Sequence, residues 1–223
     1  MKKTPYKLLD DDDLTETQIY VTIQSFDRFS QEYAEKWEWN PDTVKEVKKY
    51  NIQPFIKYAK EKGNVLLVGC RSGRDYDLLT KEDFSCLGID FSYGLLSEAV
   101  KRVPAGLFIR LDPRSLPFMP ESFSAIYADS LTLVPKRDIK QVLKDYSIFL
   151  KKKGILYLSL KLGEKNVLLI EDEAGKRYYT LYKKEEVLKM LNSAGFKVLW
   201  SKVSKCTDLV LPEWFSLVAQ KNP

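Results

Sequence analysis

The apolar run at residues 65–68 (VLLV) constrains the fold of this chain more than any other segment. Such a short, continuous run is typical of a strand buried on both faces of a parallel sheet. Gly69 and Gly73 follow it within one turn, and residues 75–82 have a helical pattern. A buried strand, a glycine turn and a helix form the first unit of an α/β fold. The N-terminus of such a helix favours anionic ligand groups.

The segments that follow alternate between strand and helix patterns. Alternation of this kind predicts right-handed crossovers and a parallel, doubly wound sheet with helices on both faces. The last two strand patterns leave no room for a helix between them, so they predict an antiparallel pair. The strands are expected at residues 85–90, 106–112, 125–128, 155–163, 196–204 and 214–221, and the helices at 92–103, 136–153 and 183–194. Residues 173–182 indicate a turn between two extended pieces.

Three parts are expected: a loosely ordered polar tail (residues 1–15), an N-terminal helical cap (16–62) and an α/β core (63–223). In the cap, residues 40–43 (NPDT) separate two helices, with Asn40 as N-cap and Pro41 in the first turn. An aromatic stripe precedes them at spacings of three and four residues, which suits either plain packing or a cover over a ligand pocket. The stripe consists of Phe26, Phe29, Tyr33 and Trp37.

The composition excludes several classes of site. The chain has no histidine, so histidine triads and most transition-metal sites are excluded. Its three cysteines (Cys70, Cys86 and Cys206) are widely spaced and predict neither a disulfide framework nor a zinc site. The net charge is +5, but lysines alternate with glutamates, which favours a solvated surface over a nucleic-acid interface. No apolar run is long enough to span a bilayer, and the first residues lack a secretory signal, so a cytoplasmic location is expected.

Ligands of open parallel sheets bind at the carboxyl ends of the strands. Asp90 ends the second core strand about twenty residues after the glycine turn, where a carboxylate can accept hydrogen bonds from a ribose. Asp112 follows the third strand. Each feature alone also suits an ordinary turn or helix cap, but together they favour a nucleotide site. The dinucleotide motif G-x-G-x-x-G is not met, because its three positions hold Gly69, Arg71 and Arg74.

Five segments in this order resemble the motifs of the class I S-adenosylmethionine-dependent methyltransferases. The first, VLLVGCRSGRD, is similar to that family's glycine-rich motif V-L-D-V-G-C-G-[ST]-G-R-D. The resemblance covers residues 26–220 and implies a Rossmann-like, seven-stranded sheet whose last strand is antiparallel. The other four segments are GIDFSYGLLSEAVKR, LDPRSLPFMPESFSAIYADSL, FLKKKGILYLSLKLGE and RYYTLYKKEEVLKMLNSAGFKV.

The resemblance also implies S-adenosylmethionine as cofactor. By position, residues 128–130, including Asp129, would form the floor of the methyl-donor pocket, and Tyr33 would cover it. Asp90 would bind the ribose hydroxyls, Phe91 would lie beside the adenine and Asp112 would reach its amino group. The methionine part would be surrounded by Gly69, Cys70, Arg71 and Gly73.

Two departures from the family motif lie in the glycine turn. Leu67 stands where the family has an acid that helps hold the cofactor's ammonium group, and Arg71 replaces the middle glycine. Losing a charge-assisted hydrogen bond costs about ten- to a hundredfold in affinity. Arg71 either points away from the site or binds the cofactor's carboxylate as a fork.

The sequence therefore predicts methyl transfer to a small-molecule acceptor. The alternative is a catalytically degenerate relative that acts as a binding or regulatory module. An RNA methyltransferase would need a basic face that the sequence does not indicate. Neither nucleic acid nor membrane is expected as a partner, and the protein is expected to be a monomer or homodimer. Candidates for a general base are Asp129, Tyr33 and Glu164, and none is assigned.

Overall fold

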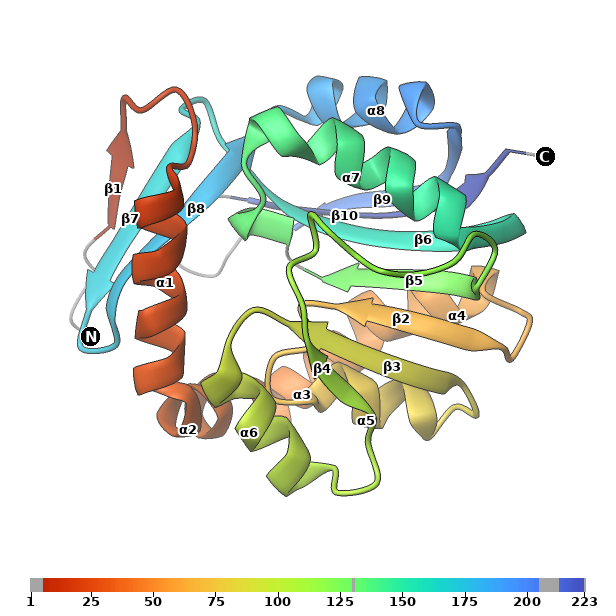
Figure 1. Ribbon diagram of the computed structural model, residues 1–223, viewed down its shortest axis with the longest axis horizontal. Coiled ribbons are helices and arrows are strands. Elements are labelled where there is room, and N and C mark those ends of the chain that lie inside the picture. The colour runs from red at the N-terminus through yellow and green to blue at the C-terminus, as the bar shows by residue number, and fades with distance from the viewer. Residues whose placement is uncertain (1–5, 130, 205–212, 223) are drawn as a thin grey trace.

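Strand β2 (Asn64–Val68) forms the centre of a twisted sheet, as its apolar sequence predicts (Figure 1). The computed structural model describes residues 6–129, 131–204 and 213–222. Val65 to Val68 are at most 2% exposed, because β2 lies between two parallel strands and helices cover both of its faces. In Figure 1 the carboxyl ends of the central strands point toward the first long helix.

The predicted doubly wound α/β fold is confirmed. Seven strands form the core sheet, and the last of them is antiparallel to both of its neighbours, as expected. From one edge to the other they are β4 (Phe108–Arg110), β3 (Ser85–Asp90), β2, β5 (Phe123–Asp129), β6 (Leu150–Leu162), β10 (Trp214–Lys221) and β9 (Phe196–Ser204).

Three further strands extend the sheet beyond the expected seven. The hairpin β7 (Val167–Asp172) and β8 (Gly175–Tyr182) joins the end of β6, where Lys161 and Leu162 pair with the end of β8. Strand β1 (Tyr6–Leu9) then pairs with β7. The sequence predicted a loosely ordered tail here, but the exposed edge of β7 supplies partners for its backbone hydrogen bonds.

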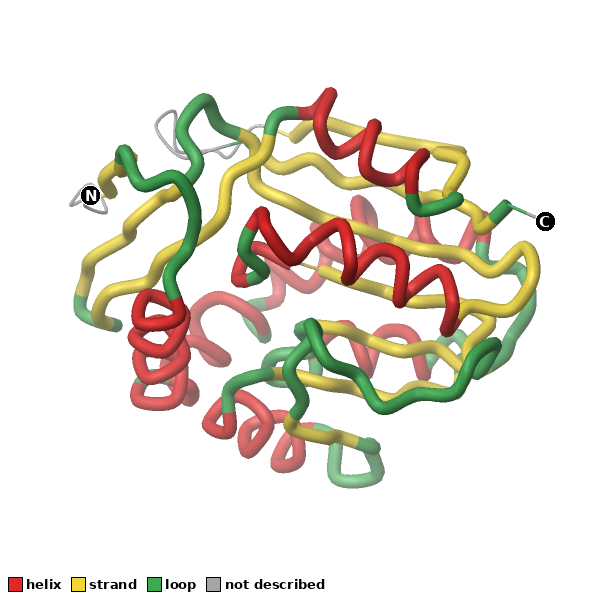
Figure 2. The backbone as a smooth tube through the Cα atoms, turned by 45° about the horizontal axis from the view of Figure 1, so that its top comes forward, coloured by secondary structure: helices red, strands yellow, loops and turns green. Residues whose placement is uncertain are grey.

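Helices cover both faces of the sheet (Figure 2). On one face lie α7 (Lys136–Phe149) and α8 (Lys184–Ser193), which share a core with β2, β5 and β6. On the other face lie α3 (Pro41–Val47), η2 (Lys48–Ile52), α4 (Gln53–Tyr58) and α5 (Arg74–Thr80). The remaining helices are α1 (Glu16–Arg28), α2 (Ser30–Tyr33), η1 (Ala34–Glu38), α6 (Tyr93–Arg102) and η3 (Leu131–Leu133).

The aromatic stripe of the cap does not lie on one helix face. Helix α1 ends at Arg28, because Phe29 leaves the helical conformation with φ −112° and ψ 18°. The chain then changes direction through α2 and η1. Phe26 and Tyr33 still make an edge-to-face contact, with ring centroids 5.3 Å apart, whereas Trp37 is 63% exposed.

Helix α7 is shorter than predicted. The sequence placed its end at Gly154, but it ends at Phe149, where Leu150 adopts an extended conformation and pairs with Phe123 on β5. Lys153 has a positive φ of 60° within β6, where the register against β5 is irregular. The lysine-rich segment before Gly154 therefore begins the strand and does not extend the helix.

Candidate active site

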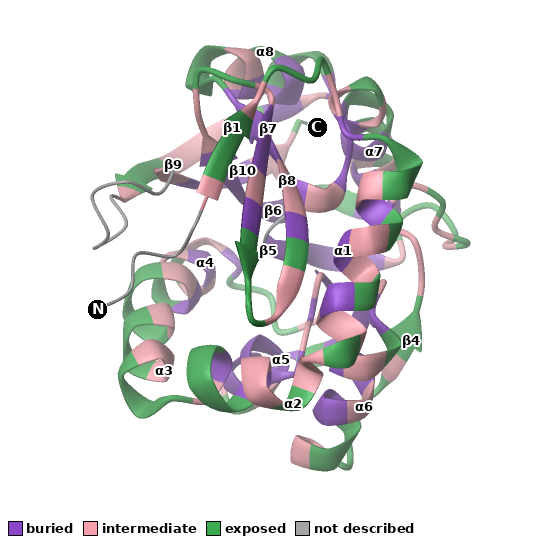
Figure 3. Cartoon of the chain, turned by 90° about the vertical axis from the view of Figure 1, so that its left-hand side faces the viewer, coloured by how far each residue is buried: buried purple, intermediate pink, exposed green. Residues whose placement is uncertain are grey.

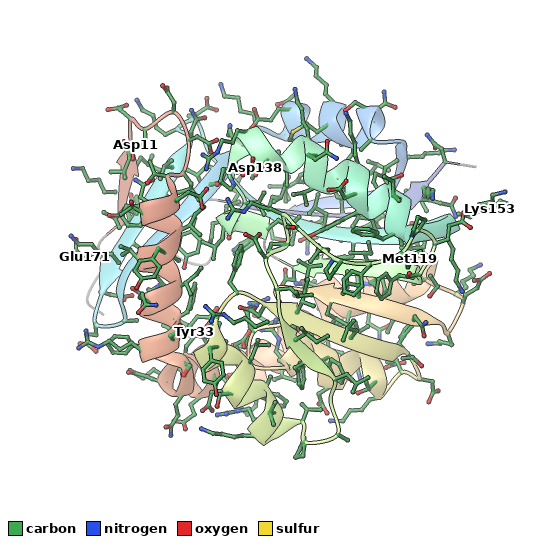
Figure 4. The ribbon with its side chains drawn as sticks, viewed as in Figure 1. Asp11, Tyr33, Met119, Asp138, Lys153 and Glu171 are labelled. Atoms are coloured by element: carbon green, nitrogen blue, oxygen red, sulfur yellow. The ribbon has the colours of Figure 1, made fainter. Side chains whose placement is uncertain are left out.

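A cavity of about 180 Å³ lies at the carboxyl ends of β2, β3 and β5. Figure 3 looks onto this edge, where α1, α2 and the β7–β8 hairpin surround the ends of the strands. Figure 4 labels Tyr33 beside the lower end of α1, between that helix and the loops of the sheet edge. Six of the predicted site residues line the cavity: Tyr33, Gly69, Arg71, Asp90, Phe91 and Asp129.

The glycine turn keeps a tight left-handed course despite Arg71. Gly69, Arg71 and Gly73 have φ values of 73°, 51° and 86°. A non-glycine residue is uncommon at such angles, so Arg71 carries backbone strain of about 1 kcal/mol or more. The amides of Gly69 and Cys70 both donate to the carbonyl of Ile89 on β3, at 2.9 and 3.0 Å. These bonds hold the turn against the neighbouring strand.

Asp90 joins the turn to the next helix. Its carboxylate accepts hydrogen bonds from the backbone amides of Arg71 and Ser92, each at 2.9 Å. Burial raises the pKa of Asp90 to about 6, although these two amide hydrogen bonds oppose the shift. The carboxylate is therefore ionised at neutral pH and has capacity to accept further hydrogen bonds from the cavity side.

The side chain of Arg71 enters a cluster of buried charges. Its guanidinium forms ion pairs with Asp129 at the end of β5 and with Glu38 on η1, the second at 3.2 Å. Asp75 on α5 lies 3.7 Å from the same group. Burial alone would lower the pKa of Arg71, but the surrounding carboxylates, Asp129 foremost, raise it well above its ordinary value. The guanidinium is therefore charged at every relevant pH.

Residues 65–154 match the family model for the methyltransferase domain, over a stretch that holds the turn, Asp90 and Asp129. Within this stretch the chain resembles the S-adenosylmethionine-dependent methyltransferases. S-adenosylmethionine is the cofactor of this family. No curated protein sequence matches the chain.

Solved methyltransferase structures share the fold. The 1,6-didemethyltoxoflavin-N1-methyltransferase of Burkholderia thailandensis, solved with 1,6-didemethyltoxoflavin and S-adenosylhomocysteine, is 15% identical, with a TM-score of 0.73 over 100% of this chain and 97% of that one. A methyltransferase from Clostridium acetobutylicum is also 15% identical, with a TM-score of 0.68 over 89% and 99%. The [4+2]-cyclase SpnF, 15% identical, has a TM-score of 0.70 over 92% and 96%. At these identities the likeness establishes the fold alone.

Three predicted site residues of this methyltransferase domain do not line the cavity: Cys70, Gly73 and Asp112. Asp112 was expected to face the cavity, but Arg114 donates hydrogen bonds of 2.8 to 3.1 Å to the Asp112 carboxylate. Arg114 also binds Glu16 on α1 at 2.7 Å. Asp112 therefore helps to attach α1 to the core, because a nearby arginine satisfies its charge. Cys70 is buried within the turn, and Gly73 is the N-cap of α5.

Other predicted groups also differ in position. Of the expected pocket floor at residues 128–130, Ala128 is fully buried, Asp129 lines the cavity and Ser130 lies outside the described residues. Glu164, a candidate base, has a side chain that is 89% exposed and pairs with Lys183 at 3.3 Å. Asp129 and Tyr33 are thus the base candidates that reach the cavity.

The sequence missed two groups of site residues. Glu38 is 2% exposed and accepts a hydrogen bond of 2.9 Å from the amide of Ser72, inside the glycine turn. Trp39 donates to the hydroxyl of the same serine at 3.0 Å. Lys161, which also lines the cavity, lies over the Trp214 ring, 4.0 Å from its centroid. Nothing local marks these residues, because each reaches the site through a distant element.

Within the described ranges, no three cysteine or acidic side chains are arranged to hold a metal ion. In the same part of the chain, none of the helices combines the length and apolar character needed to cross a membrane.

Proposed function

We propose that this protein transfers the methyl group of S-adenosylmethionine to a small-molecule acceptor. The observation that carries the proposal is the convergence of the glycine turn, the Asp90 carboxylate and the Tyr33 ring on one cavity at the carboxyl edge of the sheet. In folds of this kind that edge is where nucleotide ligands bind.

The residues present fit the adenosine half of the cofactor. Asp90 offers carboxylate oxygens that can accept hydrogen bonds from a ribose diol. Next to it the cavity wall is apolar, formed by Phe91, Leu95 and Leu111. An apolar wall beside one carboxylate suits an adenine base that stacks while its ribose is held.

The amino-acid tail would lie against the glycine turn and the end of β5. Leu67 is 1% exposed and contributes no charge to this end of the cavity. Asp129, on the neighbouring strand, supplies a carboxylate there. This end fits the tail when Arg71 is turned away from Asp129.

The bound cofactor would supply an electrophilic methyl group on a sulfonium. The protein's contribution is to align the acceptor and exclude water, which lowers the entropic barrier of a direct displacement. Phe26 and Tyr33 line the cavity, whose volume of about 180 Å³ favours a small acceptor over a polymer. The Burkholderia relative, whose structure holds 1,6-didemethyltoxoflavin, supports an acceptor of this size.

Calorimetric titration with S-adenosylmethionine tests the proposal, using Asp90→Asn and Asp112→Asn as a matched pair. Both variants lose one carboxylate near the sheet edge, but only Asp90 lines the cavity. We expect Asp90→Asn to bind about ten- to a hundredfold more weakly and Asp112→Asn to bind like wild type. Release of S-adenosylhomocysteine in a screen of small nucleophiles then identifies the acceptor. Equal losses in the two variants contradict the assigned cavity.

A second candidate is a binding or regulatory module that retains the fold without methyl transfer. The ion pairs of Arg71 at the tail end of the cavity favour it. The [4+2]-cyclase with the same fold is an example in which the fold does not dictate the reaction. Ligand binding without any transfer to the screened nucleophiles would support this candidate.

A further inference from the structure

Arg71 spans the end of the cavity that adjoins the glycine turn. Its amide donates to Asp90 at one side, and its guanidinium reaches Asp129 at the other. Between them its Nε lies 3.4 Å from the carbonyl oxygen of Gly69. The side chain is 18% exposed, and it forms part of the cavity wall.

The carboxylates that contact Arg71 come from three separate elements. Glu38 belongs to η1 of the cap, Asp75 to α5 and Asp129 to the end of β5. Glu38 is held in turn by the amide of Ser72 at 2.9 Å. A side chain held from three directions has one preferred position, and these contacts offset the strain of the left-handed backbone at Arg71.

The cluster retains an excess of negative charge. Three carboxylates meet two guanidinium groups, those of Arg71 and Arg74. Arg74 lies 3.8 Å from Asp129, so Arg71 is the closer partner of that carboxylate. If Arg71 turned away, Asp129 would offer an incompletely paired anion to the cavity, which is costly unless a cation replaces the guanidinium.

Asp129 lies at the end of β5, close to the position of Leu67 on the neighbouring strand β2. Leu67 on β2 pairs with Tyr127 on β5, and Asp129 follows two residues later. Because side chains alternate along a strand, Asp129 points to the same face as Tyr127. A carboxylate thus lies at this edge of the sheet, one strand away from the position of Leu67. The guanidinium of Arg71 already forms an ion pair with it.

We propose that Arg71 is a specificity-determining residue that competes with the cationic tail of the cofactor for Asp129. In the described conformation it closes the tail end of the cavity and leaves the adenosine end open. S-adenosylmethionine binds only by displacing Arg71, whereas a nucleoside without the amino-acid tail does not. This inference rests on the proposed function, because it concerns the cofactor of the same cavity.

Calorimetric titration of the full-length chain with three ligands tests the inference. S-adenosylmethionine and S-adenosylhomocysteine carry the tail, and 5′-methylthioadenosine shares their nucleoside but lacks it. We expect Arg71→Ala to bind the two tailed ligands about ten- to a hundredfold more tightly than wild type. Its affinity for 5′-methylthioadenosine should stay within about twofold. Arg102→Ala is the matched control, since it removes a guanidinium from α6 outside the cavity.

Arg71→Lys is a second variant that is less prone to a folding defect, because it keeps a positive charge beside the buried carboxylates. An ammonium group cannot contact Glu38 and Asp129 as a fork, so the affinity of this variant for S-adenosylmethionine should fall between wild type and Arg71→Ala. Weaker binding of the tailed ligands by Arg71→Ala would mean that Arg71 holds the cofactor, and equal binding would mean that it does not obstruct it. Either result overturns the inference while the nucleoside site stands. If none of the three ligands binds any variant, the proposed function falls as well.

Discussion

The carboxylate of Asp27 on α1 accepts a hydrogen bond of 2.6 Å from the hydroxyl of Ser92, 65 positions away. The same oxygen accepts a bond of 2.8 Å from the amide of Gly94 in the first turn of α6. Ser92 in turn donates its amide to Asp90. One chain of hydrogen bonds therefore connects the cap to the carboxylate that faces the cavity.

Asp27→Ala should loosen the cap. The change leaves the Gly94 amide without its acceptor and removes a negative charge from the N-terminus of α6, so we expect a loss of about 1–3 kcal/mol in the free energy of unfolding. Urea denaturation measures it. Asp77→Ala is the control, because the side chain of Asp77 forms an i,i+4 pair with the exposed Lys81, and its loss should cost below about 0.5 kcal/mol. Equal losses would contradict the role of Asp27.

Glu38→Ala should destabilise the protein by about 3 kcal/mol, because it removes one partner from a buried ion pair and leaves guanidinium groups without it. The neighbouring Glu35→Ala on the same helix is the matched control. Glu35 is exposed and accepts one hydrogen bond from Gln31. Thermal and urea unfolding of both variants compare them. A Glu38→Ala protein as stable as Glu35→Ala would show that Glu38 does not hold the turn.

Ligand binding should weaken in acid through Asp90. Burial raises the pKa of Asp90 from 3.8 to about 6, so the carboxylate is ionised above about pH 6 and protonated below it. A ribose diol donates hydrogen bonds to the ionised form, so binding is complete at pH 7.5 and is lost as the pH falls through 6. We expect the dissociation constant of 5′-methylthioadenosine to rise about tenfold at pH 5.

Two other charged groups affect the titration of Asp90: Arg71 lowers its pKa and Glu38 raises it. Asp90→Asn separates its contribution from theirs. This variant should bind the nucleoside weakly at every pH and show no step near pH 6. A step of the same size in Asp90→Asn would assign the pH dependence to another group.

Phe26→Ala should weaken cofactor binding more than Phe29→Ala does. Phe26 lines the cavity and contacts Tyr33, whereas Phe29 lies beyond the end of α1 and does not line it. Loss of half-buried apolar area of this size corresponds to about a tenfold rise in the dissociation constant of S-adenosylmethionine. Calorimetry on both variants measures it. Equal effects would mean that the aromatic residues of the cap serve packing alone.

The sequence alone determined the architecture of the core, because its signals are local. The run at residues 65–68 is apolar throughout and is buried as β2, and Ser92 caps α6 by accepting from the Leu95 amide at 3.1 Å. The segment between the last two strand patterns has no room for a helix, and this predicted the antiparallel pair β9 and β10. Such features depend on neighbours in the chain, and short-range physics suffices to predict them.

Tertiary structure alone decided how the site is charged. Asp129, which pairs with Arg71, is 58 positions away in the chain, and Glu38 reaches the turn from the cap. Asp112 ends at the same sheet edge as Asp90, yet Arg114 neutralises it and only Asp90 faces the cavity. A side chain's residue type specifies which partners it can accept, but which charge lies within reach depends on how distant elements pack. The sequence therefore predicted the position of the ligand site, and the tertiary structure placed the side chain of Arg71 inside it.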